Sequence, residues 1–163
     1  MVEVNNILMV CLGNICRSPV AEGIMKNRLD HYNLNIAVDS AGTSNYHPGE
    51  NPDLRSTKNA LKNGIDISNI VARQFKVQDF DNFDIIYVMD EQNKIDVLNL
   101  SRNDTDKSKV KLMLTELPGT SYKNVPDPYF GDEAGFQLVF DLLSEACENV
   151  AQRLKHQKTL QKK

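Results

Sequence analysis

A short segment near the N-terminus contains a thiol and a guanidinium group six positions apart, Cys11 and Arg17. A cysteine thiolate is a strong nucleophile, and the planar fork of an arginine matches two oxygens of a tetrahedral oxyanion such as phosphate. The same fork can hold oxygens of a trigonal-bipyramidal transition state. The hydroxyl of Ser18 could donate to the Cys11 sulfur, both when it attacks and when it leaves. These residue types at this spacing indicate covalent attack on a phosphate ester.

The elements around this segment would shape an anion site. The apolar run at residues 7–10 predicts a buried strand, and Ser18 as N-cap with Pro19 as the first helical residue predicts a helix directly after the turn. Backbone N–H groups of a tight turn and of a helix N-terminus point into one concavity, where they favour an anion and the thiolate form of a cysteine. Gly13 relaxes the steric limit on φ, and Asn14 tolerates a left-handed conformation. Phosphate contacts are therefore expected from Leu12, Gly13, Asn14, Ile15, Cys16, Arg17 and Ser18.

The rest of the chain alternates short apolar runs with helical patterns, which is typical of a parallel sheet. Strands are predicted at 7–10, 36–38, 85–88 and 110–114, and helices from Ser18, over 52–63, after Asp90 and along an apolar stripe from Phe136 to Leu154, with short helical turns at 77–83. The expected fold class is α/β: a single-domain, open, parallel four-stranded sheet with helices on both faces, Rossmann-like. The domain should span residues 1–156, followed by a basic, disordered tail at 157–163. Ligands of such sheets bind beyond the carboxyl ends of the strands, which favours the turn after residue 10.

Composition excludes several classes of protein. The chain has 163 residues, 40% hydrophobic and 25% charged, and its 19 basic and 22 acidic residues give a net charge of −3. It lacks the broad basic surface of nucleic-acid-binding proteins, and no apolar run is long enough for a membrane span. The N-terminus shows no signal-peptide pattern and the three cysteines are an odd, sparse set, which together indicate reduced thiols in the cytoplasm. The three histidines have no ligand spacing, so neither a metal nor another cofactor is expected.

The string from Cys11 to Pro19, which continues to Ala21 and Glu22, resembles the low-molecular-weight protein tyrosine phosphatases, and the resemblance extends over essentially the whole chain. Further matching strings are Val38-Asp39-Ser40-Ala41-Gly42-Thr43, Ala72-Arg73-Gln74, Met89-Asp90-Glu91 and Pro126-Asp127-Pro128-Tyr129-Phe130. The resemblance implies a fold of the phosphotyrosine protein phosphatase I type. It also implies hydrolysis of phosphotyrosine and small aryl phosphates through a cysteinyl-phosphate intermediate, with tyrosine-phosphorylated proteins or peptides as substrates and phosphate, vanadate or similar oxyanions as inhibitors.

The resemblance assigns roles to individual residues. It implies Cys11 as the nucleophile, Arg17 as the ligand of the phosphate and the transition state, and Asp127 as the general acid. A positioned carboxylic acid can protonate a leaving phenolate, and the prolines on both sides of Asp127 confine its backbone. The implied walls of an aromatic substrate slot are Tyr46, Tyr129 and Phe130, and the implied supports of the loop are Asn14, Ser18 and Ser40. Many relatives have a His where this chain has Ile70, which leaves the support of the loop open.

Two further cysteines have different expected roles. A sulfenic acid on Cys11 could condense with the nearby thiol of Cys16 and so be spared further oxidation, which predicts redox regulation with Cys16 as the partner. Cys147 lies in the apolar stripe of the last helix and is expected in the core.

Three other functions compete with a tyrosine phosphatase. A thiol enzyme of the arsenate-reductase type resembles this fold and loop, but it needs two further cysteines after the third strand, and residues 82–94 contain none. A phosphoprotein-binding module without catalysis is disfavoured because Cys11, Arg17 and Asp127 are all present. A protein arginine phosphatase is the closest alternative. Those enzymes have Thr where this chain has Ile15, whose side chain offers a buried guanidinium group no hydrogen bond, so phosphotyrosine is the expected substrate.

Overall fold

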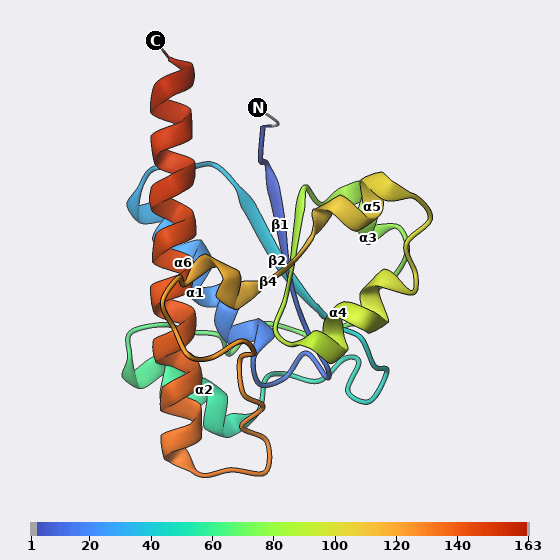
Figure 1. Ribbon diagram of the computed structural model, residues 1–163. Helices are drawn as coiled ribbons and strands as arrows, with labels where there is room; N and C mark the ends of the chain where they lie inside the picture. The colour runs from blue at the N-terminus through green and yellow to red at the C-terminus, as the bar shows by residue number, and fades with distance from the viewer. Residues whose placement is uncertain (1–2, 163) are drawn as a thin grey trace.

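The computed structural model describes residues 3–162 of the chain (Figure 1). A parallel four-stranded sheet has the order β2-β1-β3-β4. Its strands are β1 (Asn6–Cys11), β2 (Ala37–Gly42), β3 (Ile85–Val88) and β4 (Val110–Leu112). The expected α/β fold class is confirmed, because helices cover both faces of this sheet.

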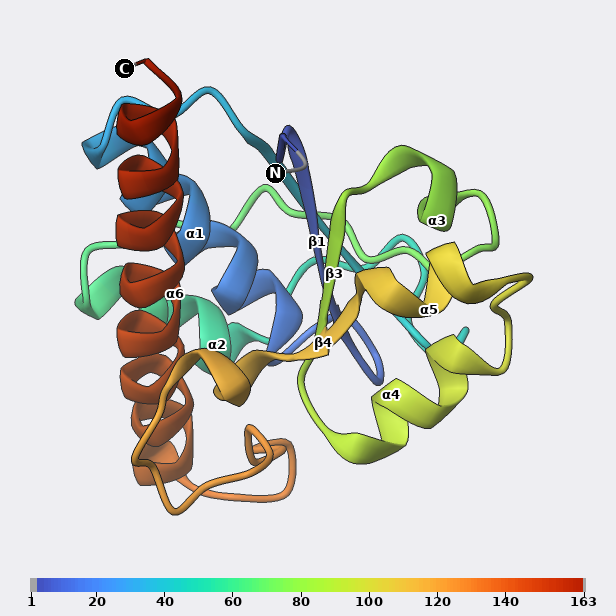
Figure 2. The ribbon, with the colours of Figure 1, turned by 45° about the horizontal axis from the view of Figure 1, so that its top comes forward.

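The two faces of β1 explain its uninterrupted apolar sequence. Ile7 and Met9 face the larger core, under α1 (Ser18–His31), α2 (Leu54–Lys62) and α6 (Glu133–Gln161). Leu8 and Val10 face the smaller core, beside α3 (Asp79–Asn82), α4 (Glu91–Leu98) and α5 (Asp104–Lys109). Figure 2 shows these two groups of helices on opposite sides of the sheet. Burial on both faces explains why residues 7–10 of the strand are all apolar.

Several element boundaries differ from the sequence-based expectation. Strand β2 begins one residue later than expected but continues through the polar Asp39 and Ser40 to Gly42. Strand β4 ends at Leu112, and the apolar residues that follow form a 3-10 helix, η1 (Met113–Glu116). Helix α5 was not expected, because all six of its residues are polar and only its N-cap, Asn103, signals it.

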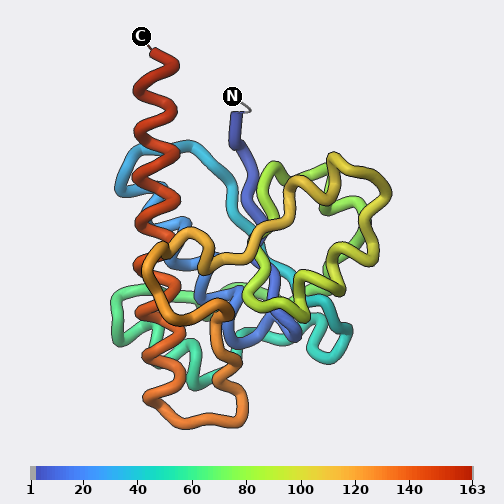
Figure 3. The backbone as a smooth tube through the Cα atoms, in the orientation of Figure 1, coloured from blue at the N-terminus to red at the C-terminus, as the bar shows by residue number. Residues whose placement is uncertain are grey.

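The last helix is longer than its apolar stripe. Leu154 is its last buried residue, yet the helix continues to Gln161, as the tube in Figure 3 also shows. Backbone hydrogen bonds continue without burial there, and the Thr159 hydroxyl adds a bond to the Lys155 carbonyl. The segment expected as a disordered tail is therefore helical up to Gln161, and Lys163 lies outside the described residues. Within residues 3–162, no helix is both long and apolar enough to cross a bilayer.

The sheet brings three strand ends to one edge. Cys11 is in register with Gly42, and Val10 is in register with Val88. The loops at residues 12–17, 43–53 and 117–132 meet beyond this edge, at the end of the molecule opposite the chain termini (Figure 1).

Candidate active site

The predicted nucleophile is the last residue of β1 and is buried, with 2% of its surface exposed. Its sulfur lies 3.0 Å from the Ser18 hydroxyl oxygen and accepts a hydrogen bond from the Asn14 backbone N–H at 3.3 Å. Ser18 is the first residue of α1 rather than its N-cap; Arg17 occupies the cap position without a side-chain bond to the helix. The hydroxyl that was expected to cap the helix is directed at the sulfur instead. Two donors are thus placed to stabilise a thiolate.

The loop between β1 and α1 offers unpaired donors to a bound anion. Among residues 3–162, the backbone N–H groups of Leu12, Gly13, Ile15, Cys16 and Arg17 donate to no other group of the protein. Five free amides at the N-terminus of a helix of 14 residues form a site suited to a phosphate group.

Gly13, in this loop, and Gly42, which packs against it, have close neighbours. The role of Gly13 differs from the expectation. The left-handed residue is Asn14, with φ +57°, as its residue type predicted. Gly13 does not have a positive φ, so its role is not to relax the backbone. A Cβ at Gly13 would lie 3.0 Å from Cδ2 of His47, and a Cβ at Gly42 would lie 2.8 Å from the Leu12 carbonyl oxygen. Gly42 is required because backbone atoms leave no room for a side chain there, whereas a side chain at Gly13 would need a small shift of the His47 ring.

The Arg17 side chain is buried and held from one end. Its Nη1 donates to Oδ2 of Asp90 at 2.6 Å and to the Val125 carbonyl oxygen at 3.1 Å. Burial alone would lower its pKa, but the negative charges of Cys11 and Asp90 outweigh burial and raise it. The guanidinium is therefore charged, and its Nε and Nη2 donate to no other group among the described residues. These two nitrogens are available to hold phosphate oxygens.

The predicted general acid lies on the other side of the site. Oδ2 of Asp127 is 3.7 Å from Nη2 of Arg17, and Oδ1 accepts a hydrogen bond from the Tyr129 backbone N–H at 3.1 Å. The side chain is 43% exposed, so a proton can be exchanged with solvent between reaction cycles. The loop at 117–132 thus brings the carboxyl group within reach of a phosphate ester bound by Arg17.

A cavity of about 270 Å³ joins these groups. Its base contains Cys11 and Arg17, Asp127 lies at its side, and all three predicted wall residues line it. Tyr129 is braced by two contacts, an edge-on ring contact from Phe130 at 4.9 Å and the Arg55 guanidinium at 5.6 Å from its ring centre. Phe130 itself is 97% exposed, so it forms the outer rim rather than a deep wall. The cavity is a short aromatic slot above a thiol.

The three predicted support residues also come together. The Asn14 side-chain amide donates to the hydroxyl oxygens of Ser18 at 2.8 Å and Ser40 at 2.9 Å. The side-chain Oδ1 of Asn14 accepts a hydrogen bond from the backbone N–H of Arg73 at 3.1 Å. Ile70, at the position of the His in many relatives, packs on the larger core instead of joining this network.

Cys16 and Cys147 differ from Cys11 in their surroundings. Burial, with the negative charges of Asp53 and Cys11, raises the pKa of Cys16 to about 12. Cys147 is fully buried in the larger core, and this burial also raises its pKa. Both are therefore protonated at neutral pH. Among residues 3–162, no cluster of three or more His, Cys, Asp or Glu is arranged to hold a metal ion.

Sequence patterns missed Asp90, His47 and Glu22 as site residues. Asp90 could have been found, because it follows the carboxyl end of a predicted strand next to the first strand. His47 lines the slot and contacts Oε2 of Glu50 at 2.6 Å through its Nδ1. Glu22 hydrogen-bonds Ser40 and is taken up below.

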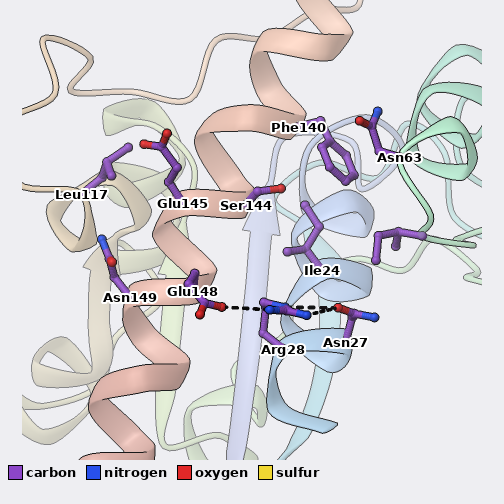
Figure 4. A pocket seen from close by; sticks show the side chains of 11 residues that line it. Ile24, Asn27, Arg28, Asn63, Leu117, Phe140, Ser144, Glu145, Glu148 and Asn149 are labelled. Carbon is purple, nitrogen blue, oxygen red and sulfur yellow. Dashed lines mark hydrogen bonds and ion pairs between the residues drawn. The ribbon is translucent and has the colours of Figure 1, made fainter. Parts of the chain in front are cut away.

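A larger groove lies elsewhere, between α1 and α6, and has a volume of about 530 Å³ (Figure 4). Arg28 crosses it to pair with Glu148 at 3.2 Å, and Ile24 and Phe140 form its apolar side. None of the predicted site residues lines this groove. The volume of a cavity therefore does not identify the site, because this groove is larger than the slot.

Comparison with known proteins agrees with this geometry. The family model described as low molecular weight phosphotyrosine protein phosphatase matches residues 6–160. A protein of Synechocystis sp., whose name places it among the low molecular weight protein-tyrosine-phosphatases, is 44% identical over 88% of this chain and 92% of its own length. The human low molecular weight phosphotyrosine protein phosphatase is 39% identical over 87% of this chain and 90% of its own. The crystal structure of a protein tyrosine phosphatase from Entamoeba histolytica with Hepes in the active site has a TM-score of 0.88 and 38% identity, covering 94% of this chain and 99% of that one.

Proposed function

The chain belongs to the low molecular weight phosphotyrosine protein phosphatase family, and we propose that Cys11, Arg17 and Asp127 carry out its reaction. The protein is a protein-tyrosine phosphatase that acts through a cysteine, and its substrates are phosphoproteins. The observation that supports these three residues most strongly is that all of them line one aromatic slot, with the sulfur at its base.

In the first half of the reaction, the Cys11 thiolate attacks phosphorus. A sulfur–phosphorus bond forms while the bond from phosphorus to the phenolic oxygen breaks. Asp127, as the carboxylic acid, transfers its proton to that oxygen, because a phenolate is a poor leaving group. The free amides of the loop and the Arg17 guanidinium balance the negative charge of the transferred phosphoryl group.

In the second half, water attacks the phosphorus of the cysteinyl phosphate. The Asp127 carboxylate accepts a proton from this water, inorganic phosphate forms, and the sulfur leaves as a thiolate. The Ser18 hydroxyl, 3.0 Å away, donates to the departing sulfur. The Ser18 hydroxyl and the Asn14 backbone N–H therefore stabilise the thiolate both as nucleophile and as leaving group.

Hydrolysis of p-nitrophenyl phosphate tests this assignment. A metal chelator should not reduce the activity, because the loop amides and Arg17, rather than a metal cation, stabilise the negative charge of the phosphoryl group. Cys11→Ser should abolish turnover but still bind phosphate, since a hydroxyl remains protonated where a thiol ionises. Activity that a chelator removes and added metal restores would contradict the mechanism.

Ile15 favours phosphotyrosine over phosphoarginine. Its side chain lines the slot and is 8% exposed, so it presents a dry apolar surface next to the phosphate loop. A phenyl ring packs on such a surface, whereas a guanidinium group there would lack hydrogen-bond partners. The arginine phosphatase is therefore not favoured. The arsenate-reductase-like enzyme is not favoured because residues 82–94 contain no cysteine.

Cys16 is proposed as the redox partner of Cys11. Peroxide would oxidise the Cys11 thiolate to a sulfenic acid, and the Cys16 sulfur would then displace water from it to form a disulfide. The negative charge of Cys11 is one cause of the raised pKa of Cys16, so oxidation of Cys11 removes part of the barrier to ionising Cys16. All three cysteines are free thiols, which fits the proposed cytoplasmic location.

The matched variants Cys16→Ser and Cys147→Ser test this role. After peroxide and then thiol treatment, Cys147→Ser should recover as well as the unmodified protein, whereas Cys16→Ser should recover less. Equal recovery of all three proteins would remove Cys16 from the proposal.

A further inference from the structure

Glu22 is a buried carboxyl group that the reaction above does not use. It lies on α1, one turn after Ser18, and is 3% exposed. Its Oε1 accepts the Ser40 hydroxyl at 2.6 Å, and its Oε2 accepts Lys26 Nζ at 2.6 Å. A buried carboxylate is costly unless it is both hydrogen-bonded and paired, and Glu22 meets both conditions.

Among residues 3–162, Lys26 is the only basic side chain that lines the surface hollow over Glu22. The hollow is also lined by three further carboxyl groups, those of Asp30, Asp39 and Asp66. Asp39 already pairs with Arg73 at 3.0 Å, outside the lining of the hollow. The ammonium of Lys26, whose side chain is 52% exposed, is therefore the cation that compensates Glu22.

The hydrogen bonds behind the phosphate loop have a defined direction. A carboxylate can only accept, so the Ser40 hydroxyl donates to Glu22, and its oxygen is left to accept from the Asn14 amide at 2.9 Å. The orientation of that amide is fixed independently, because its carbonyl oxygen accepts the Arg73 backbone N–H. The second amide hydrogen is donated to the Ser18 hydroxyl oxygen at 2.8 Å.

Ser18 completes the chain at the nucleophile. Its oxygen accepts from Asn14, so its own hydrogen must be donated elsewhere. Two acceptors are in reach, the Cys11 sulfur at 3.0 Å and the Ala41 carbonyl oxygen at 3.5 Å. The sulfur is nearer and becomes negatively charged, so it is the better acceptor.

We propose that Glu22 and Lys26 form a positioning pair behind the phosphate loop. Glu22 anchors the chain Ser40–Asn14–Ser18 that ends on the Cys11 sulfur, and Lys26 neutralises this anchor so that its charge does not oppose the thiolate or a bound phosphate. The inference rests on the proposed function only in taking Cys11 as the nucleophile. Neither residue touches the substrate.

The first part of the proposal, that Lys26 neutralises the charge of Glu22, is tested with four variants. The measurement is the pH dependence of Cys11 alkylation by iodoacetamide. Lys26→Met should move the midpoint of that curve to higher pH, with alkylation below the midpoint about threefold slower, because the charge of Glu22 is then uncompensated. Glu22→Gln should move it to lower pH, and the double variant should return close to the unmodified protein. The matched control is Arg28→Met, which breaks the Arg28–Glu148 pair on the other side of the same helix and should leave the midpoint unchanged.

The second part of the proposal, that Glu22 anchors the hydrogen-bond chain, is tested by measuring kcat. Glu22→Leu removes the acceptor of the Ser40 hydroxyl and should lower kcat for p-nitrophenyl phosphate about tenfold, the effect of losing one hydrogen bond in the reacting state. Glu22→Gln should retain most of kcat, since its amide carbonyl can still accept. If Glu22→Leu does not fold, the Lys26 variants still test whether Lys26 neutralises the charge of Glu22.

Two results would overturn the proposal. In the first, the midpoint of the Cys11 alkylation curve is the same in all variants. In the second, Lys26→Met and Arg28→Met shift this midpoint equally. Peptide mapping of the alkylated protein separates these results from failure of the proposed function. Label on Cys11 with unchanged midpoints removes only the positioning pair, whereas the absence of label on Cys11 removes the nucleophile itself.

Discussion

The contact between Arg17 and Asp90 leads to a prediction about turnover. Asp90 uses one carboxylate oxygen to hold Arg17 Nη1 at 2.6 Å and the other to accept the Asn93 backbone N–H at 2.7 Å, which caps α4. Asp90→Asn keeps a good helix cap, because asparagine is as favourable as aspartate there. Its side-chain N–H would then face Arg17 Nη1, donor against donor. Arg17 would keep only the Val125 carbonyl oxygen as a partner for this nitrogen.

The expected magnitude follows from the kind of bond that is lost. A hydrogen bond between charged groups contributes about 1.5–3 kcal/mol, and here it fixes the orientation of the transition-state ligand. Loss of that orientation should lower kcat roughly 10- to 100-fold. Removal of a negative charge near the phosphate site acts in the opposite sense on binding, so KM should stay the same or fall.

Steady-state kinetics on p-nitrophenyl phosphate measures the effects on kcat and KM separately, and thermal unfolding measures the effect on stability. Asn103→Ala is the matched control, because Asn103 caps α5 by accepting the Asp106 N–H at 2.9 Å and lies outside the slot. It should lose about 1 kcal/mol of folding stability without a change in kcat. An Asp90→Asn protein with the kcat of the unmodified enzyme would refute the argument that Asp90 orients Arg17.

Three further predictions concern the acid, the slot and the core. Asp127→Ala should slow formation of the cysteinyl phosphate by about 10² to 10⁴, with a loss that grows with the pKa of the leaving phenol; an equal loss across a series of phenols would contradict a general acid. Ile15→Thr should narrow the ratio of kcat/KM on phosphotyrosine and phosphoarginine peptides, and an unmodified enzyme that prefers phosphoarginine would refute the substrate assignment. Despite its burial, Glu116 has a pKa below its usual value because Arg153 and Tyr87 donate to it. Arg153→Met should therefore cost about 1–2 kcal/mol of stability at neutral pH, a value reduced by the partial exposure of Arg153, and the difference should shrink as acid protonates Glu116; a pH-independent difference in urea unfolding would contradict this.

The parts of the site that sequence predicted best are contiguous in the chain. Strand, turn, thiol, arginine and helix start follow one another within residues 7–19, so local rules suffice to place the phosphate loop. Residue types also indicated the left-handed Asn14. The reason given for Gly13 was wrong, because its φ is not positive. The side chain that packs against it, His47, comes from a loop more than 30 positions away.

The parts that sequence missed depend on contacts through space. Asp90 is 73 positions from Arg17, and Ser40 is 18 positions from Glu22, so no periodic pattern connects them. Strand β2 could not be bounded from hydropathy, because Ser40 is buried by hydrogen bonds rather than by apolar packing. Helix α5 and the end of α6 lack an apolar stripe, which is the signal by which helices are recognised in sequence.

Trapping of the covalent intermediate tests the central claim most directly. The protein is mixed with phosphotyrosine peptide, quenched within milliseconds and digested, and the phosphorylated peptide is identified by mass spectrometry. The mechanism predicts one phosphate on the sulfur of Cys11, and no such adduct in Cys11→Ser. Phosphate on any other residue, or turnover by Cys11→Ser, would contradict it.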